Sequence, residues 1–152
     1  MDASIERKIV DLLNGHRIMT IATLRPDGWP QATTVGYVNE GLTLWFLCGL
    51  GSQKAKNLAK DDRVSITVDH DTPDIMAITG LSMAARAHRV NDLTEAQKVL
   101  AQLPLKYADA NPGSVPMAMP KPDEVALFRV VPALISVLDY TKGFGHTDLV
   151  TC

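Results

Sequence analysis

Residues 49–58 read Gly-Leu-Gly-Ser-Gln-Lys-Ala-Lys-Asn-Leu, and this stretch joins an apolar segment to an amphipathic one. The two glycines permit a tight turn and a close approach of the backbone to a ligand. Ser52 is a typical helix cap, and the small and apolar residues that follow it recur at helical spacing. We therefore predict that a strand ends here and that a short helix runs from Ser52 to Lys60.

The start of this predicted helix has the features of an anion site. First-turn N–H groups have no partner within a helix, and the positive end of the helix dipole lies beside them. Lys54 adds a full positive charge at the same place. Ser52, Gln53 and Lys54 are therefore candidate phosphate-binding residues. The Gly-Lys-Ser/Thr order of a P-loop is absent, and a capped surface helix with a solvated lysine is the alternative.

The rest of the chain is mostly strand-like, with helices of small size between the strands. β-Branched residues, alternation and turn signals predict strands at 17–24, 31–38, 42–48, 63–69, 75–90, 125–131 and 133–140. Helices are predicted at 5–13, with Gly15 as its stop, and at 93–103. Residues 104–122 contain five of the nine prolines and are expected to be irregular, as is the polar tail that ends the chain.

Most of these strands are joined by tight turns, which indicates an antiparallel barrel of about six strands decorated by helices. The long crossovers of a parallel sheet are missing. A length of 152 residues predicts a single domain over residues 1–152. We therefore expect a mainly β chain with small helices.

Composition excludes several classes of protein. The chain has 15 Lys and Arg against 17 Asp and Glu, so a net charge of -2 argues against binding to nucleic acid or to an anionic membrane. Two cysteines, Cys48 and Cys152, give neither a disulfide framework nor metal-ligand spacing. The first residues are unlike a signal peptide, and the apolar runs are too short to span a bilayer. A cytoplasmic protein without a metal is the expectation.

A second candidate site is the predicted strand that contains Thr33, Thr34 and Val35. Small and hydroxyl side chains leave room for a flat ligand against the backbone, whose N–H and C=O groups can pair with it. The alternative is an ordinary strand with a solvent-facing pair of threonines.

Taken together, the order and spacing of these features resemble the pyridoxamine 5'-phosphate oxidase-like family of FMN-binding split barrels. The resemblance covers roughly residues 5–90 and extends more loosely through the last strands. It depends on the turn at Asp27-Gly28, the aromatic strand Leu44-Trp45-Phe46, Ser52-x-Lys54, Asn57-Leu58 and Asp62-Arg63-Val64.

The resemblance implies a six-stranded antiparallel split barrel, a homodimer and an FMN held at the subunit interface. In that family a Ser-Arg-Lys segment binds the FMN phosphate, and it falls here on Ser52, Gln53 and Lys54, so a neutral glutamine replaces an arginine. The residues that the family places along the flavin fall on two strands, at Thr33, Thr34, Val35, Leu47 and Cys48.

Two departures bear on the activity. True oxidases of the family carry a tryptophan and an arginine in the final strands, whereas this chain has no tryptophan after Trp45 and no arginine after Arg129. The resemblance therefore implies a flavin-dependent oxidoreductase that passes hydride or electrons to a small substrate other than pyridoxamine phosphate. The alternatives are a deazaflavin-dependent reductase of the same fold and a non-catalytic protein that binds flavin or haem.

Overall fold

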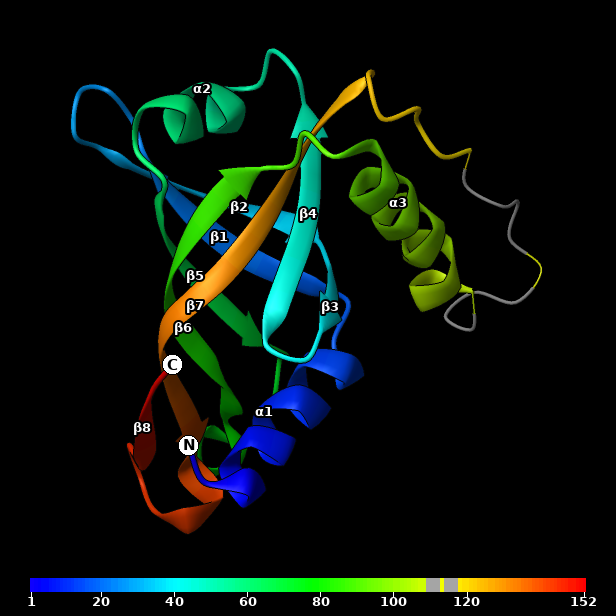
Figure 1. Ribbon diagram of the computed structural model, residues 1–152. Coiled ribbons are helices and arrows are strands. Elements are labelled where there is room, and N and C mark those ends of the chain that lie inside the picture. The colour runs from blue at the N-terminus through cyan, green and yellow to red at the C-terminus, as the bar shows by residue number, and fades with distance from the viewer. Residues whose placement is uncertain (109–112, 114–117) are drawn as a thin grey trace.

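The computed structural model describes residues 1–108, 113 and 118–152 as a curled sheet with three helices against it (Figure 1). The strands are β1 (Ile18–Leu24), β2 (Pro30–Gly36), β3 (Val38–Glu40), β4 (Thr43–Gly49), β5 (Arg63–Asp69), β6 (Thr79–Arg89), β7 (Val125–Asp139) and β8 (Thr147–Thr151). The helices are α1 (Ala3–Gly15), α2 (Gln53–Lys60), α3 (Leu93–Tyr107) and the short 3-10 helices η1 (Ile75–Ala77) and η2 (Tyr140–Lys142).

All strand pairs in this sheet are antiparallel. The strand order is β2-β1-β5-β6-β7-β4-β3, and β8 pairs with β7. The sheet curls so that β2, at one end of this order, approaches β4 near the other. The predicted fold class, an antiparallel split β-barrel with small helices, is confirmed, with eight strands in the described part of the chain instead of six.

Two features of the C-terminal region correct the prediction. β7 is one strand through Pro132, where two strands were expected. Its register with β6 shifts between Ala84 and Ala85, so the bulge at this point accommodates the proline without ending the strand. The tail that was expected to be irregular forms β8, in which Val150 is buried and lies opposite Ile135 of β7.

The ends of three other predicted elements also differ. The strand predicted at 31–38 ends at Gly36, where an added Cβ would lie 2.5 Å from the hydroxyl oxygen of Tyr107, and β3 then begins at Val38. Residues 75–77 form η1, so β6 starts at Thr79. α3 continues through Pro104 to Tyr107, and most of the remaining irregular stretch lies outside the described residues.

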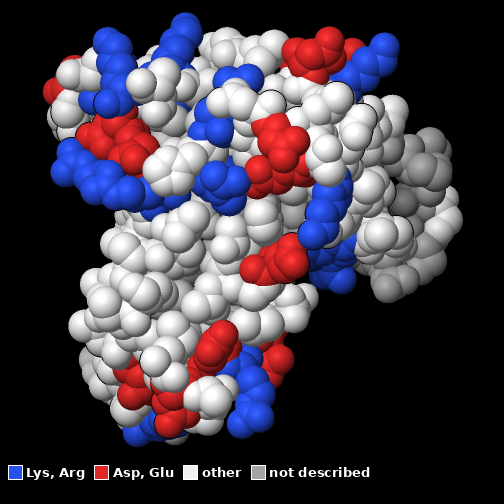
Figure 2. All heavy atoms as spheres, in the orientation of Figure 1, with Lys and Arg blue, Asp and Glu red and all other residues white. Residues whose placement is uncertain are grey.

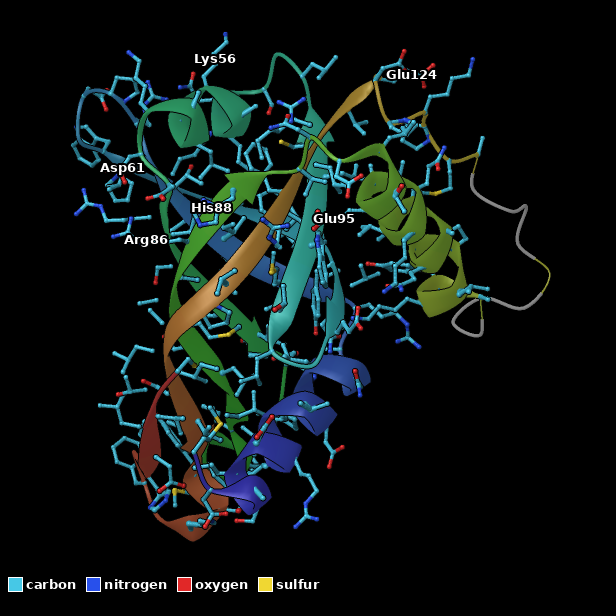
Figure 3. The ribbon with its side chains drawn as sticks, viewed as in Figure 1. Lys56, Asp61, Arg86, His88, Glu95 and Glu124 are labelled. Carbon is cyan, nitrogen blue, oxygen red and sulfur yellow. The ribbon has the colours of Figure 1, made fainter. Side chains whose placement is uncertain are left out.

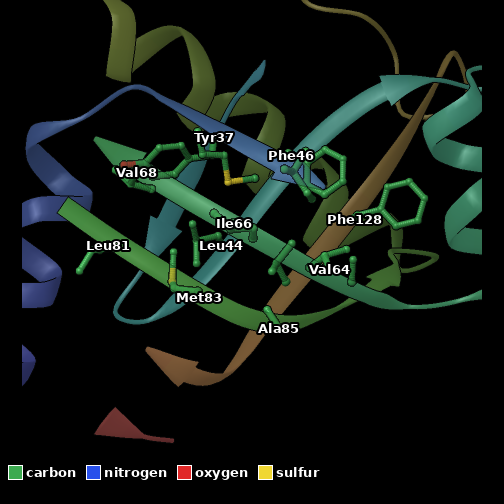
Figure 4. Packing of buried hydrophobic residues seen from close by; sticks show 14 of the residues in the cluster. Tyr37, Leu44, Phe46, Val64, Ile66, Val68, Leu81, Met83, Ala85 and Phe128 are labelled. Carbon is green, nitrogen blue, oxygen red and sulfur yellow. The ribbon is translucent and has the colours of Figure 1, made fainter. Parts of the chain in front are cut away.

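The core has two parts. The larger lies inside the curled sheet, where alternate residues of β1 and β4–β7 meet, with Tyr37, Phe46, Ile66 and Met83 among its fully buried side chains (Figure 4). The smaller lies between α3 and the outer face of β4 and β7. Within the described ranges, no helix has the length and apolar character needed to cross a bilayer.

Candidate functional site

The N-terminus of α2 has the local geometry that the sequence predicts. Ser52 caps the helix, because its Oγ accepts a hydrogen bond from the backbone N–H of Ala55 at 3.2 Å. The N–H of Lys56 donates to the carbonyl oxygen of Ser52 at 3.1 Å, which closes the first helical turn. Gln53 and Lys54 precede this bond, so their N–H groups belong to the unpaired first turn of the helix. An anion placed there would meet N–H donors and the Lys54 ammonium.

A buried polar bridge attaches this helix to the sheet. The Nδ2 of Asn57, which is fully enclosed, donates to Thr23 Oγ1 on β1 at 2.9 Å and to Gln31 Oε1 on β2 at 3.3 Å. Its Oδ1 accepts a hydrogen bond from Gln53 Nε2 at 2.8 Å. We call these four residues, Thr23, Gln31, Gln53 and Asn57, the polar bridge. It fixes the candidate phosphate site relative to β1 and β2.

The polar bridge also shows what the glutamine at position 53 does. Its side-chain amide is directed to Asn57, so the side chain is used within the protein. Gln53 can therefore contact a ligand only through its backbone N–H. Lys54 is the residue of this turn whose side chain supplies a positive charge to an anion. The role of Asn57 was missed by the sequence analysis, although its position four residues after Gln53 on the buried side of α2 was a usable signal.

The second candidate segment lies on β2, which is an edge strand of the sheet. Its residues alternate: Gln31, Thr33 and Val35 face the barrel, whereas Thr34 is exposed on the other face. Thr33 Oγ1 is buried and has no hydrogen-bond partner among the described residues. A buried polar atom without a hydrogen-bond partner destabilises a protein. Because this hydroxyl lies on an edge strand near the candidate anion site, it indicates a position where a bound ligand could donate or accept a hydrogen bond.

The side chains of the two residues predicted at the end of β4, Leu47 and Cys48, point to opposite faces of the sheet. Cys48 faces the large core and is opposite Ala126 of β7. Leu47 faces the other side and packs against the cluster beneath α3. Successive residues of a strand point to opposite faces, so these two side chains enter different parts of the core. The structure thus groups Ser52, Gln53 and Lys54 with β2 through the polar bridge and leaves Leu47 apart.

Charged residues gather at the end of the molecule that carries α2, with acidic and basic side chains interleaved (Figure 2). Arg86 Nη1 lies 2.5 Å from Asp62 Oδ1, and Arg63 Nη2 lies 2.7 Å from Asp61 Oδ2. Figure 3 shows Asp61, Arg86 and His88 near the end of α2. The hydrogen bond from the Arg63 side chain lowers the pKa of Asp61 to about 2. These arginines are therefore largely neutralised.

Three clefts in the described part of the chain are lined by residues other than Thr33 and Lys54. One of about 430 Å³ is lined by Trp45, Glu95 and Arg129 under α3, and one of about 530 Å³ runs beside α1. The third, of about 250 Å³, lies along β1 and β5 and includes Thr23 and Pro30.

The curled antiparallel sheet, with a capped helix attached to its edge strand by buried polar groups, defines a split β-barrel protein. The chain belongs to the pyridoxamine 5'-phosphate oxidase family, whose sequence profile matches residues 5–138.

Solved structures agree with this assignment. A conserved hypothetical protein of Mycobacterium tuberculosis is 28% identical, with 97% of this chain and 91% of that chain covered and a TM-score of 0.76. The haem storage protein HutZ of Vibrio cholerae is 20% identical over 96% of this chain and 93% of its own, with a TM-score of 0.65. A haem-binding protein of Mycobacterium smegmatis is 20% identical over 96% of this chain and 56% of its own, with a TM-score of 0.70. At such identities the last two comparisons establish the fold alone.

Proposed function

We propose that this chain is an FMN-binding flavoprotein and that it acts as an oxidoreductase on a small substrate. The observation that carries the proposal is the buried hydroxyl of Thr33, which has no hydrogen-bond partner among the described residues, on a strand that the polar bridge joins to the capped start of α2. Gln31 and Thr33 are two residues apart on one face, a separation of about 7 Å along the strand. A flavin ring at Thr33 and its phosphate at the start of α2 would suit this arrangement.

The protein's part would be to bind and orient the flavin. Lys54 and the first-turn N–H groups of α2 would hold the phosphate, and Thr33 with the free edge of β2 would hold the ring. Gln53 contributes no charge, so the phosphate site depends on Lys54. The flavin, when bound, supplies hydride or electron transfer.

A homodimer with the flavin between the subunits is part of the proposal. Large apolar side chains are exposed in the single chain, among them Trp29 at 72%, Phe144 at 73% and Leu149 at 66%. A second copy across a two-fold axis would cover apolar surface and close the site. Sedimentation of the cofactor-loaded protein should give twice the mass of a 16.5 kDa chain. A single-chain mass with the cofactor retained would contradict this arrangement.

The test of the function is the visible spectrum of the purified protein, followed by mass spectrometry of the released ligand. Oxidised FMN and its mass are expected. Bleaching by NADH or NADPH without oxygen would show that the bound flavin can be reduced, and recovery of the colour with an added acceptor would show turnover. A protein that binds neither FMN nor a related flavin on titration would contradict the proposal.

The second candidate function is haem or flavin storage without turnover, which is favoured by the likeness to a haem storage protein of the same fold. A Soret band, or a bound flavin that no pyridine nucleotide reduces, would support storage. A ligand with the spectrum and mass of a deazaflavin would instead assign a deazaflavin-dependent reductase.

A further inference from the structure

Two histidines from distant parts of the chain face each other at the end of α1. The Nε2 atom of His16 lies 3.1 Å from the Nδ1 atom of His70, and the centres of the two rings are 5.3 Å apart. His16 directly follows the last residue of α1, and His70 directly follows β5. The two positions are 54 residues apart in the chain, so the spacing of residues in the sequence gave no indication of this pair.

The hydrogen bonds of His16 determine which of its ring nitrogens carries a lone pair. Its Nδ1 atom lies 2.7 Å from the carbonyl oxygen of Leu12. A carbonyl oxygen can only accept, so Nδ1 carries the proton, and Nε2 of the neutral ring presents its lone pair to His70. A backbone carbonyl bound to the far ring nitrogen is also the arrangement that orients metal-binding histidines in proteins.

The distance between the two facing nitrogens suits a shared metal ion. Zinc–imidazole bonds are about 2.0–2.1 Å long, so two nitrogens on one ion are about 2.9 Å apart at a right angle and about 3.3 Å apart at the tetrahedral angle. The observed 3.1 Å lies between these values. His70 is exposed, so its ring is free to turn and its proton can move through solvent to the outer nitrogen, Nε2. Both facing nitrogens then have lone pairs for the ion.

The surroundings of the pair favour a cation. His16 stands at the C-terminus of α1, where the negative end of the helix dipole lies. Asp69 and Asp71 flank His70 in the chain. Arg17, the residue after His16, is exposed, so solvent and salt screen its charge.

We propose that His16 and His70 together bind a divalent transition-metal ion such as Ni²⁺ or Zn²⁺ and so link α1 to the segment after β5. Imidazole is a preferred ligand of these ions, whereas Mg²⁺ prefers oxygen ligands. Within the described ranges, no third His, Cys, Asp or Glu completes the ligand set. Water would therefore occupy the remaining positions of the ion. The inference does not depend on the proposed cofactor.

The first experiment is a calorimetric titration of the whole protein with Ni²⁺ at about pH 7.5, where neutral histidine prevails. His16→Gln and His70→Asn should each weaken binding by about tenfold or more, because the second imidazole acts at a high effective concentration once the first is bound. His70 is exposed, so its replacement should leave the fold intact. In the unmodified protein, Ni²⁺ should also raise the temperature of thermal unfolding, and Mg²⁺ should not.

Two other variants are the controls for this titration. His88 is an exposed histidine of β6 whose Nδ1 lies 3.8 Å from an Asp62 oxygen, and Cys152 is an exposed thiol. His88→Gln and Cys152→Ser should bind Ni²⁺ as the unmodified protein does. Undetectable Ni²⁺ binding by the unmodified protein would overturn the proposal. Affinity that His70→Asn leaves unchanged, or that His88→Gln reduces equally, would show adventitious binding and would also overturn it.

The second experiment identifies the ligand atoms by ¹⁵N NMR of the histidine rings during titration with Zn²⁺. The nitrogens that bind the ion should be Nε2 of His16 and Nδ1 of His70, and their signals should shift together at one ion per chain. Protons compete for the same lone pairs, so binding should weaken below about pH 6.5. Ligation through Nδ1 of His16 or Nε2 of His70 would contradict the pairing, as would shifts confined to one of the two rings.

Discussion

Asn57 of α2 donates a hydrogen bond to Thr23 of β1 at 2.9 Å, and the two residues are 0% and 1% exposed. A helix as short as α2 has little stability of its own, because helix formation is costly to nucleate. The buried polar contact therefore determines where the helix begins relative to the sheet. The candidate phosphate site depends on that placement.

The first prediction is that Asn57→Ala destabilises the protein strongly. The change leaves Thr23, Gln31 and Gln53 without their shared partner, and unsatisfied buried groups cost about 1–3 kcal/mol each when water cannot reach them. We expect the free energy of unfolding to fall by about 2–4 kcal/mol in chemical denaturation. Asn39→Ala, at a more exposed asparagine, is the control and should cost less than about 1 kcal/mol. Equal losses in the two variants would show that the polar bridge is unimportant.

Thr33→Val is predicted to have opposite effects on stability and on binding. Valine has nearly the shape of threonine and removes the unpartnered hydroxyl, so the cofactor-free protein should gain about 1 kcal/mol. If that hydroxyl bonds to the flavin, FMN affinity should fall about 3- to 10-fold. Thr34→Val, on the exposed face, should change neither quantity. Normal FMN binding by Thr33→Val would place the ring elsewhere.

Lys54→Ala is predicted to weaken FMN binding without affecting riboflavin, which lacks the phosphate. Charge-assisted hydrogen bonds are worth about 1.5–3 kcal/mol, so the loss should be roughly 10- to 100-fold. Paired fluorescence titrations with the two flavins measure it. Lys60→Ala, at the other end of the same helix, should bind both as the unmodified protein does. A parallel loss of riboflavin affinity would mean that Lys54 supports the fold rather than the phosphate.

The fourth prediction concerns acid stability. Asp139 accepts hydrogen bonds from Lys8 and from the Thr141 side chain, and the Lys8 bond above all lowers its pKa to about 2, below the ordinary 3.8. The folded pKa lies below the unfolded one, so the stabilisation is present above about pH 4 and is lost as the pH falls toward 2. Asp139→Asn should reduce this acid-dependent loss by about 1–2 kcal/mol. Denaturation curves at pH 5 and pH 2.5 check it.

Asp27→Asn provides the matched comparison, because Asp27 is exposed and its nearest arginine atom is 3.5 Å away. Its acid sensitivity should equal that of the unmodified protein. If Asp139→Asn also leaves the acid sensitivity unchanged, the contact between α1 and the end of β7 contributes no stability.

The sequence by itself determined the local elements. Alternation in residues 63–69 predicts β5 with both ends correct, and Ser52 is the cap of α2 because a serine oxygen can accept from the first turn wherever the helix lies. The family and the barrel class also follow from the order of these elements. These features depend on residues close together in the chain, so they can be recognised without knowing what the segments contact.

Only the tertiary structure decided which segments meet. The continuity of β7 through Pro132 needs a bulge against β6, and β8 exists because β7 offers it a free edge beyond β4. Packing on each face of the sheet likewise decides that the side chains of Leu47 and Cys48 enter different clusters and that Asn57 is buried. Strand partners and buried polar contacts join residues far apart in the chain, and their energies depend on register and burial, which local composition does not specify.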